Sequence, residues 1–394
     1  MRKKLKDVCM FYSGTGFPIQ YQGQTKGEYP FYKVGDIANN AIAGKIYLEL
    51  CNNYISSDVA KMIKGCILPK DTVVFAKIGE ALKLNRRAIT SCDCLIDNNA
   101  MGIAPKLDSL RIQYFYFCMK NLKMQTLAES TTVPSVRKTV LEKYEIEVPS
   151  LVEQEEIEKK LTLTQKIIEK RRQELSYLDE IIKARFVELF ECGDHEIVKA
   201  SDVCDFITKG TTPPTGEITE EYENGKIPFL KVYNLSFTGE MLFDENPQYI
   251  LAETHNGKLA RSKVYPNDVL MNIVGPPLGK FTLVTDEFEE WNINQAIAIF
   301  RAKERILPRF LLHALMQPKV LEPFIGQAVG IRQQNLSLEQ CRNLQFPLPS
   351  LEEQKSFVEF AEQLDKSKFD TMTFAPIYAI INLYLHTYFY QGRR

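Results

Sequence analysis

The sequence predicts a mixed α/β protein, built by internal duplication, in which two similar globular domains are separated by two long antiparallel helices. Two observations support this fold class. The motif Pro-Ser-Leu-x-Glu-Gln occurs at residues 149–154 and again at 349–354. After the first copy, residues 150–192 contain neither Gly nor Pro, a pattern typical of a long helix. Two such units, each a domain followed by a helix, give the molecule approximate two-fold symmetry.

The motif is part of a longer repeat. The corresponding segments are 5–18 and 199–214, 29–37 and 227–235, 69–79 and 266–275, 97–105 and 292–301, and 130–149 and 330–349. Their order is preserved and their offset drifts only from 195 to 200 residues. The chain is therefore a duplication of one unit of about 200 residues.

The first part of each unit has the pattern of a globular domain. Short runs rich in β-branched and aromatic residues, such as VVFAKIG at 73–79 and AIAIF at 296–300, predict strands. The apolar stretch at 309–316 predicts a helix between strands. We therefore expect globular domains at 1–149 and 194–349, and long helices at 150–193 and 350–394.

Both long helices begin with a capping box. Ser150 with Glu153, and Ser350 with Glu353, have the S-x-x-E spacing that closes the first helical turn. Behind each cap, apolar residues recur at mostly three- and four-residue steps, so the helices are expected to pair through these seams. The seam residues are Leu161, Ile168, Leu175, Leu178, Ile182 and Leu189 in the first helix, and Phe357, Leu364, Ile380 and Ile381 in the second. Pro376 is expected to break or kink the second helix.

Charge and composition exclude several classes of protein. The net charge of −1 hides an asymmetry, because residues 1–150 hold 21 Lys and Arg against 14 Asp and Glu, whereas residues 193–349 hold 15 against 20. The basic first block favours an anionic partner. The nine cysteines include no Cys-x-x-Cys pair, which argues against a structural zinc site. We see neither a secretory signal nor a membrane span, so we expect a cytoplasmic chain with reduced thiols and no membrane partner.

These motifs resemble the DNA-specificity (S) subunit of Type I restriction-modification systems. The resemblance rests on the two Pro-Ser-Leu-x-Glu-Gln helix starts, on RRQELSYLDEIIKARFVELF at 171–190, and on the turns SGTGFP at 13–18 and KGTTPP at 209–214. It implies that each globular block is a target-recognition domain that reads one half of a bipartite sequence in double-stranded DNA, with a fixed spacer. The chain departs from this pattern in its acidic second block and in Pro376.

The resemblance also implies partners and the absence of intrinsic chemistry. Two methylation (M) subunits are expected to dock on the helices, and the participation of restriction (R) subunits is left open. S-adenosylmethionine, ATP and Mg²⁺ are expected only on those partner subunits, so this chain is expected to bind no cofactor and no metal and to have no catalytic residue.

Candidate DNA-contacting residues are those of the types that read base edges or hold phosphates, in segments outside the repeated framework. They are Thr15, Lys83, Asn85, Arg86, Arg87, Arg137 and Lys138 in the first block, and Lys209, Thr211, Thr212, Lys280, Arg332, Gln333, Gln334 and Asn335 in the second. For each of them a solvated surface side chain is the simpler interpretation. The three threonines are equally well explained by turn chemistry.

Two other classes of function were weighed against DNA recognition. An enzyme would need a catalytic loop, but GPPLGKF at 275–281 has neither the spacing nor the Ser or Thr of a phosphate-binding loop. Glu158-Lys159-Lys160 matches half of a nuclease motif but lies in a predicted helix, where charges usually face solvent. A structural adaptor with two protein-binding domains on a coiled-coil spacer stays open at this stage. A steep salt dependence of DNA binding would distinguish a DNA reader from an adaptor.

Overall fold

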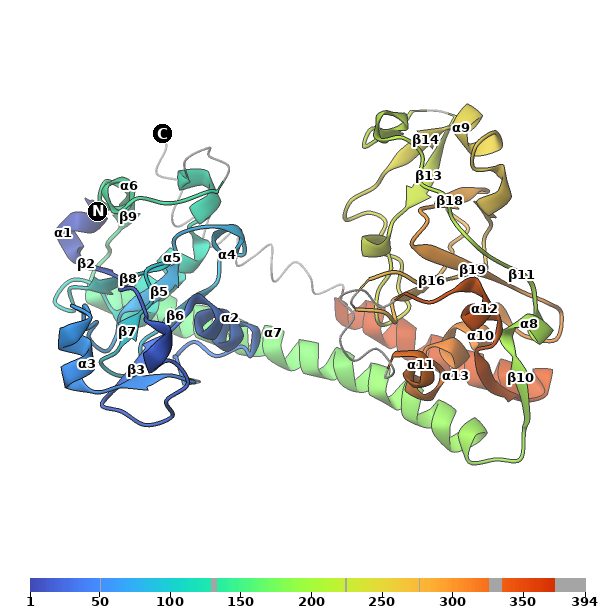
Figure 1. The fold of residues 1–394 in the computed structure, drawn as a ribbon, viewed down its shortest axis with the longest axis horizontal. Coiled ribbons are helices and arrows are strands. Elements are labelled where there is room, and N and C mark those ends of the chain that lie inside the picture. The colour runs from blue at the N-terminus through green and yellow to red at the C-terminus, as the bar shows by residue number, and fades with distance from the viewer. Residues whose placement is uncertain (50, 129–132, 224, 276, 326–334, 373–394) are drawn as a thin grey trace. The chain divides into compact units, whose positions relative to one another are not determined.

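A computed structural model describes residues 1–49, 51–128, 133–223, 225–275, 277–325 and 335–372 (Figure 1). The described chain forms two compact units, one up to Lys170 and the other from Arg171 onward. Each unit contains a four-stranded antiparallel sheet, a second sheet with a parallel strand pair, and a two-stranded ribbon at its base. The second sheet has three strands in unit 1 and five in unit 2. The prediction of a duplicated mixed α/β fold with a long helix between two domains is confirmed.

Unit 1 alternates short strands with short helices before the long helix α7. Its strands are β1 (Arg2–Lys4), β2 (Cys9–Ser13), β3 (Tyr29–Tyr32), β4 (Tyr54–Ile55), β5 (Val73–Ala76), β6 (Arg87–Ile89), β7 (Leu95–Ile96), β8 (Ala100–Pro105) and β9 (Glu145–Glu147). Its helices are α1 (Leu5–Val8), α2 (Val34–Ile42), α3 (Ser57–Met62), α4 (Glu80–Lys83), α5 (Ile112–Asn121), α6 (Lys138–Glu142) and α7 (Leu151–Phe186), and α7 crosses into unit 2.

Unit 2 repeats this order. Its strands are β10 (Glu196–Lys199), β11 (Cys204–Lys209), β12 (Ile218–Thr219), β13 (Lys226–Leu230), β14 (Tyr249–Leu251), β15 (Lys263–Val264), β16 (Val269–Asn272), β17 (Phe281–Leu283), β18 (Trp291–Ile293), β19 (Ile297–Ala302) and β20 (Gln345–Leu348). Its helices are α8 (Ala200–Val203), α9 (Ala252–Asn256), α10 (Pro308–Leu315), α11 (Pro318–Ile325), α12 (Leu338–Arg342) and α13 (Leu351–Met372).

The duplication is visible in the sheet topology. The four-stranded sheets have the orders β2-β8-β5-β6 and β11-β19-β16-β17, so equivalent strands occupy equivalent places. The parallel pair β3–β7 in unit 1 corresponds to β13–β18 in unit 2, and the basal ribbon β1–β9 corresponds to β10–β20. Sequence repeats that keep their order and a nearly constant offset therefore specify the same pairing twice.

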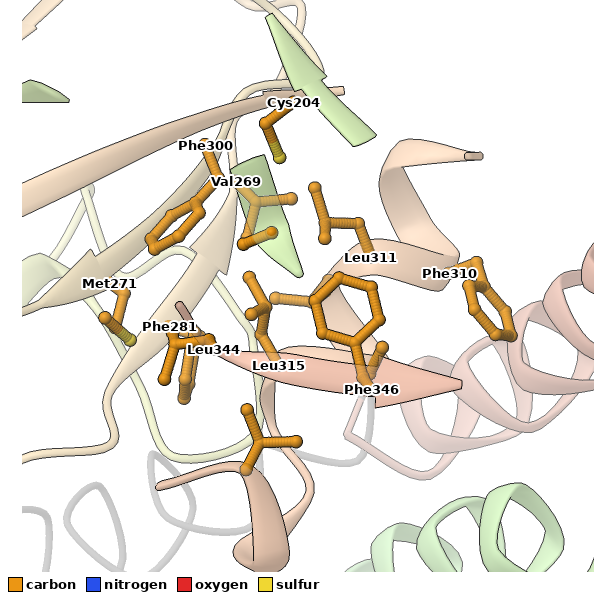
Figure 2. Close-up of a cluster of buried hydrophobic side chains, with 14 of the residues drawn as sticks. Cys204, Val269, Met271, Phe281, Phe300, Phe310, Leu311, Leu315, Leu344 and Phe346 are labelled. Carbon is orange, nitrogen blue, oxygen red and sulfur yellow. The ribbon is translucent and has the colours of Figure 1, made fainter. Parts of the chain in front are cut away.

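The four-stranded sheets are buried on both faces, which explains their continuous apolar runs. In β16, Val269 and Met271 pack into the core beneath α10 and β20, while Leu270 packs into a second core on the opposite face. Figure 2 shows the first of these cores, where Phe300, Leu311 and Phe346 meet from a strand, a helix and the basal ribbon. Unit 1 divides its residues between two faces in the same way.

The two long helices begin as predicted. The Glu153 carboxylate accepts hydrogen bonds from the backbone N–H (2.8 Å) and hydroxyl (2.7 Å) of Ser150, and Glu353 does the same for Ser350 at 2.9 Å and 2.7 Å. The last turn of the first helix, Val187–Glu191, has π-helical hydrogen bonding. It ends at the Cys192 cap, just before Gly193.

Within unit 2 the two helices run antiparallel. The Phe357 ring lies 5.5 Å from that of Phe186 and 5.6 Å from that of Phe190, while Lys368 forms an ion pair with Asp179. Later residues of α13 therefore contact earlier residues of α7, as expected for an antiparallel pair.

The predicted seam is only partly the buried one. Leu161, Ile182 and Phe357 are buried, whereas Ile168, Leu175, Leu178, Leu189 and Leu364 are half-buried. Phe186 and Phe190, which the heptad reading left out, fill the helix-pairing core because the α10 side chains of unit 2 enter it as well. Ile380, Ile381 and Pro376 lie outside the described residues.

Candidate nucleic-acid interface

Four segments that are distant in sequence meet at one end of the four-stranded sheet of unit 1. We call residues 13–16, 77–79, 97–99 and 133–136 the first recognition edge. They are held together by backbone hydrogen bonds from Thr15 to Ile96 (2.9 Å), Lys77 to Asn99 (2.8 Å), Gly79 to Pro134 (2.8 Å) and Val136 to Lys77 (2.9 Å). Loops at the end of a rigid sheet are well placed to contact a ligand.

Unit 2 has the equivalent edge. We call residues 209–212, 273–275, 294–296 and 335–336 the second recognition edge. Its backbone hydrogen bonds run from Gly210 to Ile297 (3.1 Å), Ile273 to Ala296 (2.8 Å) and Leu336 to Ile273 (2.9 Å). An isolated bridge pairs Val274 with Asn335, just as Ile78 pairs with Ser135 in unit 1. The two edges thus share a framework.

A glycine is sterically required in the first turn of each edge. A Cβ atom on Gly14 would lie 1.7 Å from the Asp97 carbonyl oxygen, and a Cβ atom on Gly210 would lie 2.3 Å from that of Asn294. The close approach lets each turn pack against the backbone that directly follows β7 or β18, the second strand of the parallel pair. The glycine-threonine signature is therefore explained by backbone packing rather than by ligand contact.

The neighbouring threonines also have structural partners. The Thr15 hydroxyl accepts a hydrogen bond from the Cys66 N–H at 3.2 Å, and the Thr212 hydroxyl accepts one from the Gln295 N–H at 3.3 Å. Thr211 accepts from the Arg261 guanidinium at 3.0 Å. The three hydroxyls lie at the edges, and each bonds a residue at least 50 positions away in sequence, so these bonds join distant segments and are not the local hydrogen bonds of turn chemistry.

The side chains of Arg87 and Asn85 bond within unit 1, whereas the sequence analysis expected them to contact DNA. Arg87 is 3% exposed, and its guanidinium donates to the Met119 and Leu122 carbonyls at 3.1 Å and 3.0 Å, at the C-terminal end of α5. Burial lowers the pKa of this guanidinium to about 10. Asn85 accepts from Arg87 at 2.7 Å and donates to the Lys120 carbonyl at 3.1 Å. Both side chains are structural, so we withdraw them as candidate base readers.

The other basic candidates of unit 1 lie near the surface. Lys83 is exposed and pairs with Glu80 at 2.7 Å, and Arg86 is half-exposed. Arg137 and Lys138 are exposed and directly follow the first recognition edge. The Lys138 ammonium lies 5.8 Å from the centroid of the Phe11 ring. These positions suit phosphate contacts.

Some of the DNA-contacting candidates of unit 2 belong to the described residues and others do not. Lys209 is exposed at the end of β11, and the Lys280 ammonium lies 5.7 Å from the centroid of the Phe237 ring, which is 48% exposed. Asn335 is exposed on the second recognition edge. Arg332, Gln333 and Gln334 lie outside the described residues.

Sequence reasoning missed the amide side chains at the tips of both edges. Asn98 and Asn99 are exposed in the turn before β8, and Gln295 is exposed in the equivalent turn before β19. The turns are fixed by Asp97 and Asn294, whose side chains accept from the backbone N–H two residues later at 2.8 Å and 3.2 Å. The repeated segments 97–105 and 292–301 contained this signal.

The Glu158 carboxylate is structural, which removes the nuclease half-motif. Glu158 is 6% exposed, and its oxygens accept from the Arg111 guanidinium at 2.8 Å and from the Tyr114 N–H at 2.9 Å. It therefore satisfies the first turn of α5. Among the described residues, no cluster of His, Cys, Asp and Glu has the arrangement of a metal site.

The acidic excess of unit 2 lies around its five-stranded sheet. The rings of Tyr222, Tyr249 and Phe288 meet there in tilted and edge-to-face contacts, with the Tyr222 ring 5.1 Å from that of Tyr249 and 6.0 Å from that of Phe288. Exposed carboxylates flank this aromatic cluster at Glu220, Glu221, Glu223, Asp244, Glu245, Asp286, Glu287 and Glu289. None of these carboxylates belongs to the second recognition edge, so the net charge of unit 2 does not describe that edge.

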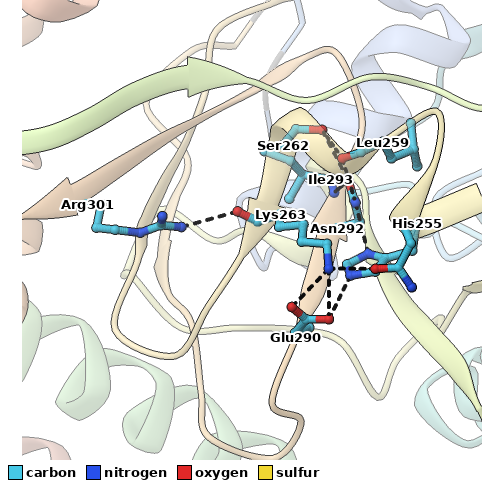
Figure 3. A network of polar contacts seen from close by, with 9 residues as sticks. His255, Leu259, Ser262, Lys263, Glu290, Asn292, Ile293 and Arg301 are labelled. Atoms are coloured by element: carbon cyan, nitrogen blue, oxygen red, sulfur yellow. Dashed lines mark hydrogen bonds and ion pairs between the residues drawn. The ribbon is translucent and has the colours of Figure 1, made fainter. Parts of the chain in front are cut away.

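The same sheet contains a buried polar network (Figure 3). His255 Nε2 lies 3.0 Å from the Glu290 carboxylate and its Nδ1 lies 3.1 Å from the Asn292 amide, while Lys263 donates to Glu290 at 3.1 Å. Burial lowers the pKa of His255, so the ring stays neutral near pH 7. Because these partners link α9, β15 and β18, the network holds the sheet together.

Two copies of one α/β domain, each with loops converging on an exposed edge and followed by a long helix, define a modular recognition protein. The family described as Type I restriction modification DNA specificity domain matches residues 1–177 and again 193–377. The chain belongs to this family. Among the described residues, no helix is both long and apolar enough to cross a bilayer.

Individual relatives agree with the family assignment. The chain is 27% identical over 390 residues to the Type I restriction enzyme MjaVIII specificity subunit of Methanocaldococcus jannaschii, covering 92% of this chain and 85% of that protein. It is 33% identical over 105 residues to the EcoBI specificity subunit of Escherichia coli, covering 26% of this chain and 22% of that protein.

A solved structure gives the same fold. It concerns complex assembly and conformational transition of the type I R-M system, and it covers 98% of this chain and 97% of its own with a TM-score of 0.52 at 17% identity. Together the comparisons confirm the prediction of a specificity subunit with a DNA-recognition role and no catalytic function of its own.

Proposed function

We propose that the chain reads a bipartite target in double-stranded DNA, one half with each recognition edge, and leaves a fixed spacer unread between them. The observation that carries this proposal is a shared framework with different side chains at equivalent positions. Asn98, Asn99 and Ser135 on the first edge correspond to Gln295, Ala296 and Asn335 on the second. Two edges with different hydrogen-bonding groups would read two different half-sites.

The chemistry of the edges suits a division between base reading and positioning. Amide side chains such as Asn98, Asn99 and Gln295 donate and accept at once, as the edge of adenine requires. Exposed cations near the edges, such as Lys83, Arg137 and Lys209, suit phosphates, which fix the register of a protein on the duplex. Retained DNA candidates outside the described residues are Arg332, Gln333 and Gln334.

We propose further that the long helices carry two methylation subunits. On this view S-adenosylmethionine, ATP and Mg²⁺ act on those partners, and this chain binds neither a cofactor nor a metal. The exposed middle of α7, which includes Leu163, Tyr177 and Ile181, offers apolar side chains for such docking.

The test is to co-express the chain with a methylation subunit and map the methylated bases in bulk DNA. The expected result is one target with two defined halves and an undefined spacer. The double variant Asn98→Ala with Asn99→Ala should relax one half only, costing about 1–3 kcal/mol per lost base contact. The variant Gln295→Ala should relax the other half. An unchanged target in both variants would remove the edge amides from the proposal.

A further inference from the structure

The last residue of the repeated motif is a buried glutamine whose side-chain amide donates two hydrogen bonds and accepts one in both copies. Gln154 and Gln354 are both 0% exposed. The Gln154 amide donates to the carbonyls of Ser109 and Pro149 at 2.9 Å each, and its oxygen accepts from the Arg111 N–H at 2.8 Å. The Gln354 amide donates to Arg305 (3.1 Å) and Pro349 (2.9 Å) and accepts from Leu307 (2.9 Å).

Each glutamine joins three elements of its unit. It sits in the first turn of a long helix, and it bonds to the proline two residues before that helix and to the segment that leads into α5 or α10. Arg111 and Leu307 are the N-cap residues of α5 and α10. The side chain therefore fixes the direction in which the long helix leaves the domain.

Helix initiation alone does not require this side chain. The capping boxes of Ser150 with Glu153 and Ser350 with Glu353 already satisfy the first turns. Around the glutamines the two copies differ, since Glu158 in the first corresponds to Val358 in the second. The same three bonds nevertheless recur, so the common feature of the two junctions is the glutamine contact.

A small angular change at such a junction has a large effect far along the helix. A 36-residue helix such as α7 is roughly 54 Å long at 1.5 Å per residue. A tilt of about 10° at its base would displace its far end by roughly 9 Å, which is close to three base pairs. A junction held by three hydrogen bonds suppresses such tilts.

We infer that Gln154 and Gln354 are positioning residues that set the angle between each recognition domain and its long helix, and thereby the spacer length that the two edges accept. The inference rests on the proposed bipartite reading. It assigns to these residues no contact with DNA. Their loss should leave recognition of each half-site intact and widen the range of spacers that are methylated.

The experiment uses the complete chain assembled with its methylation subunits. Gln154→Met and Gln354→Met keep the side-chain length but remove all three hydrogen bonds. Gln154→Glu and Gln354→Glu keep the acceptor and lose both donors. Gln24→Met, at an exposed position of unit 1 outside the first recognition edge and the long helix, is the matched control. The target is taken from wild-type methylation mapping, and duplexes carry that target with the spacer shortened or lengthened by one and two base pairs.

Two quantities are measured, namely the affinity for duplexes with one intact half-site and the methylation rate across the spacer series. The expected result for the Met variants is half-site affinity within about twofold of wild type and a fall of about tenfold or more in discrimination between spacers. The Glu variants place a buried carboxylate against two carbonyl oxygens, so they should lose at least as much spacer discrimination as the Met variants, and the control should equal wild type.

Several outcomes would overturn the inference. One is a folded complex with a Met variant and an unchanged spacer profile. Another is loss of half-site affinity equal to the loss in methylation, which indicates a general weakening. Failure of both the Met and the Glu variants to assemble would assign the glutamines to folding rather than to positioning. If wild type itself shows no half-site preference, the proposed function fails instead.

Discussion

Gly14 and Gly16 belong to the same turn but have different surroundings. A Cβ atom on Gly14 would meet the Asp97 backbone at 1.7 Å, whereas one on Gly16 would have no heavy atom within 4 Å. Gly14→Ala should therefore destabilise the chain by about 2–4 kcal/mol, because the contact is with backbone that cannot move aside. Gly16→Ala should change the free energy of unfolding by less than about 0.5 kcal/mol. Urea denaturation of both variants checks this, and equal effects would contradict the packing explanation.

Arg87 provides a second test of a single residue. Arg87→Met leaves the Met119 and Leu122 carbonyls without their donor, so the free energy of unfolding should fall by about 2–4 kcal/mol. Lys83→Met, four positions earlier and exposed, should change it by less than about 0.5 kcal/mol. A stable Arg87→Met chain with altered target specificity would restore Arg87 as a base reader.

At the scale of residues, the sequence did not show which side chains face solvent. The candidates Arg86 and Arg87 are adjacent and of one type, yet only Arg87 is buried. Burial here depends on α5, which lies over 20 residues away in sequence. Asn98 was not among the candidates because asparagine in a turn is usually assigned to turn formation.

At the scale of elements, the helix starts were predicted because capping is local in sequence. The helix-pairing seam was predicted less well, because the heptad pattern does not show what packs on each helix. Phe186 and Phe190 contact Phe310 of α10 as well as Phe357 of α13, so the buried face turns away from the heptad positions.

The ion pair between the helices gives a testable coupling. Lys368 is 6% exposed and pairs with Asp179 of α7 and, at 2.8 Å, with Asp365 of its own helix. Burial opposes the charge on Lys368, but these carboxylates outweigh it and raise its pKa. A double-mutant cycle of Lys368→Met with Asp179→Asn should give a favourable coupling energy of about 1–3 kcal/mol. Additive effects of the two changes would show that the pair does not hold the helices together.

His313 predicts a pH dependence of stability. Burial first, and then the Arg309 charge, lower the pKa of this α10 histidine to about 4. The unfolded chain binds the proton near pH 6.5, so stability is lost as the pH falls from 6.5 toward 4 and does not fall further for this group below 4. Between pH 7 and pH 5 the loss from this residue should be about 2 kcal/mol. His313→Gln should remove that share, and an equal pH slope in variant and wild type would contradict the assignment.

At the scale of the whole molecule, the duplication was predictable because the two halves of the sequence can be aligned with each other, segment by segment and in the same order. The length of the DNA spacer could not be predicted from the sequence, because it depends on both the helix length and the angle between each domain and its helix. Inserting one heptad after Glu174 and one near Met372 keeps the apolar seams nearly in register and lengthens the pair by roughly 10 Å. Asp179 faces Lys368, so the two insertions lie at a similar level of the pair.

The expected result of the insertions is loss of methylation at the original spacing and methylation of a target whose spacer is about three base pairs longer. Three base pairs also rotate the far half-site by roughly a third of a turn, which lowers the rate on the new target. Methylation mapping of the assembled complex checks this. Full activity on the original target would show that the helices do not measure DNA.

The central claim is that the two recognition edges read separate halves of one target, and domain exchange tests it most directly. Residues 194–349 would be replaced by the corresponding domain of a related specificity subunit, with residues 1–193 and 350–394 unchanged, and the methylated bases mapped in bulk DNA. The account predicts a target in which one half is new while the other half and the spacer are those of the original chain. A target altered in both halves, or unaltered in both, would contradict it.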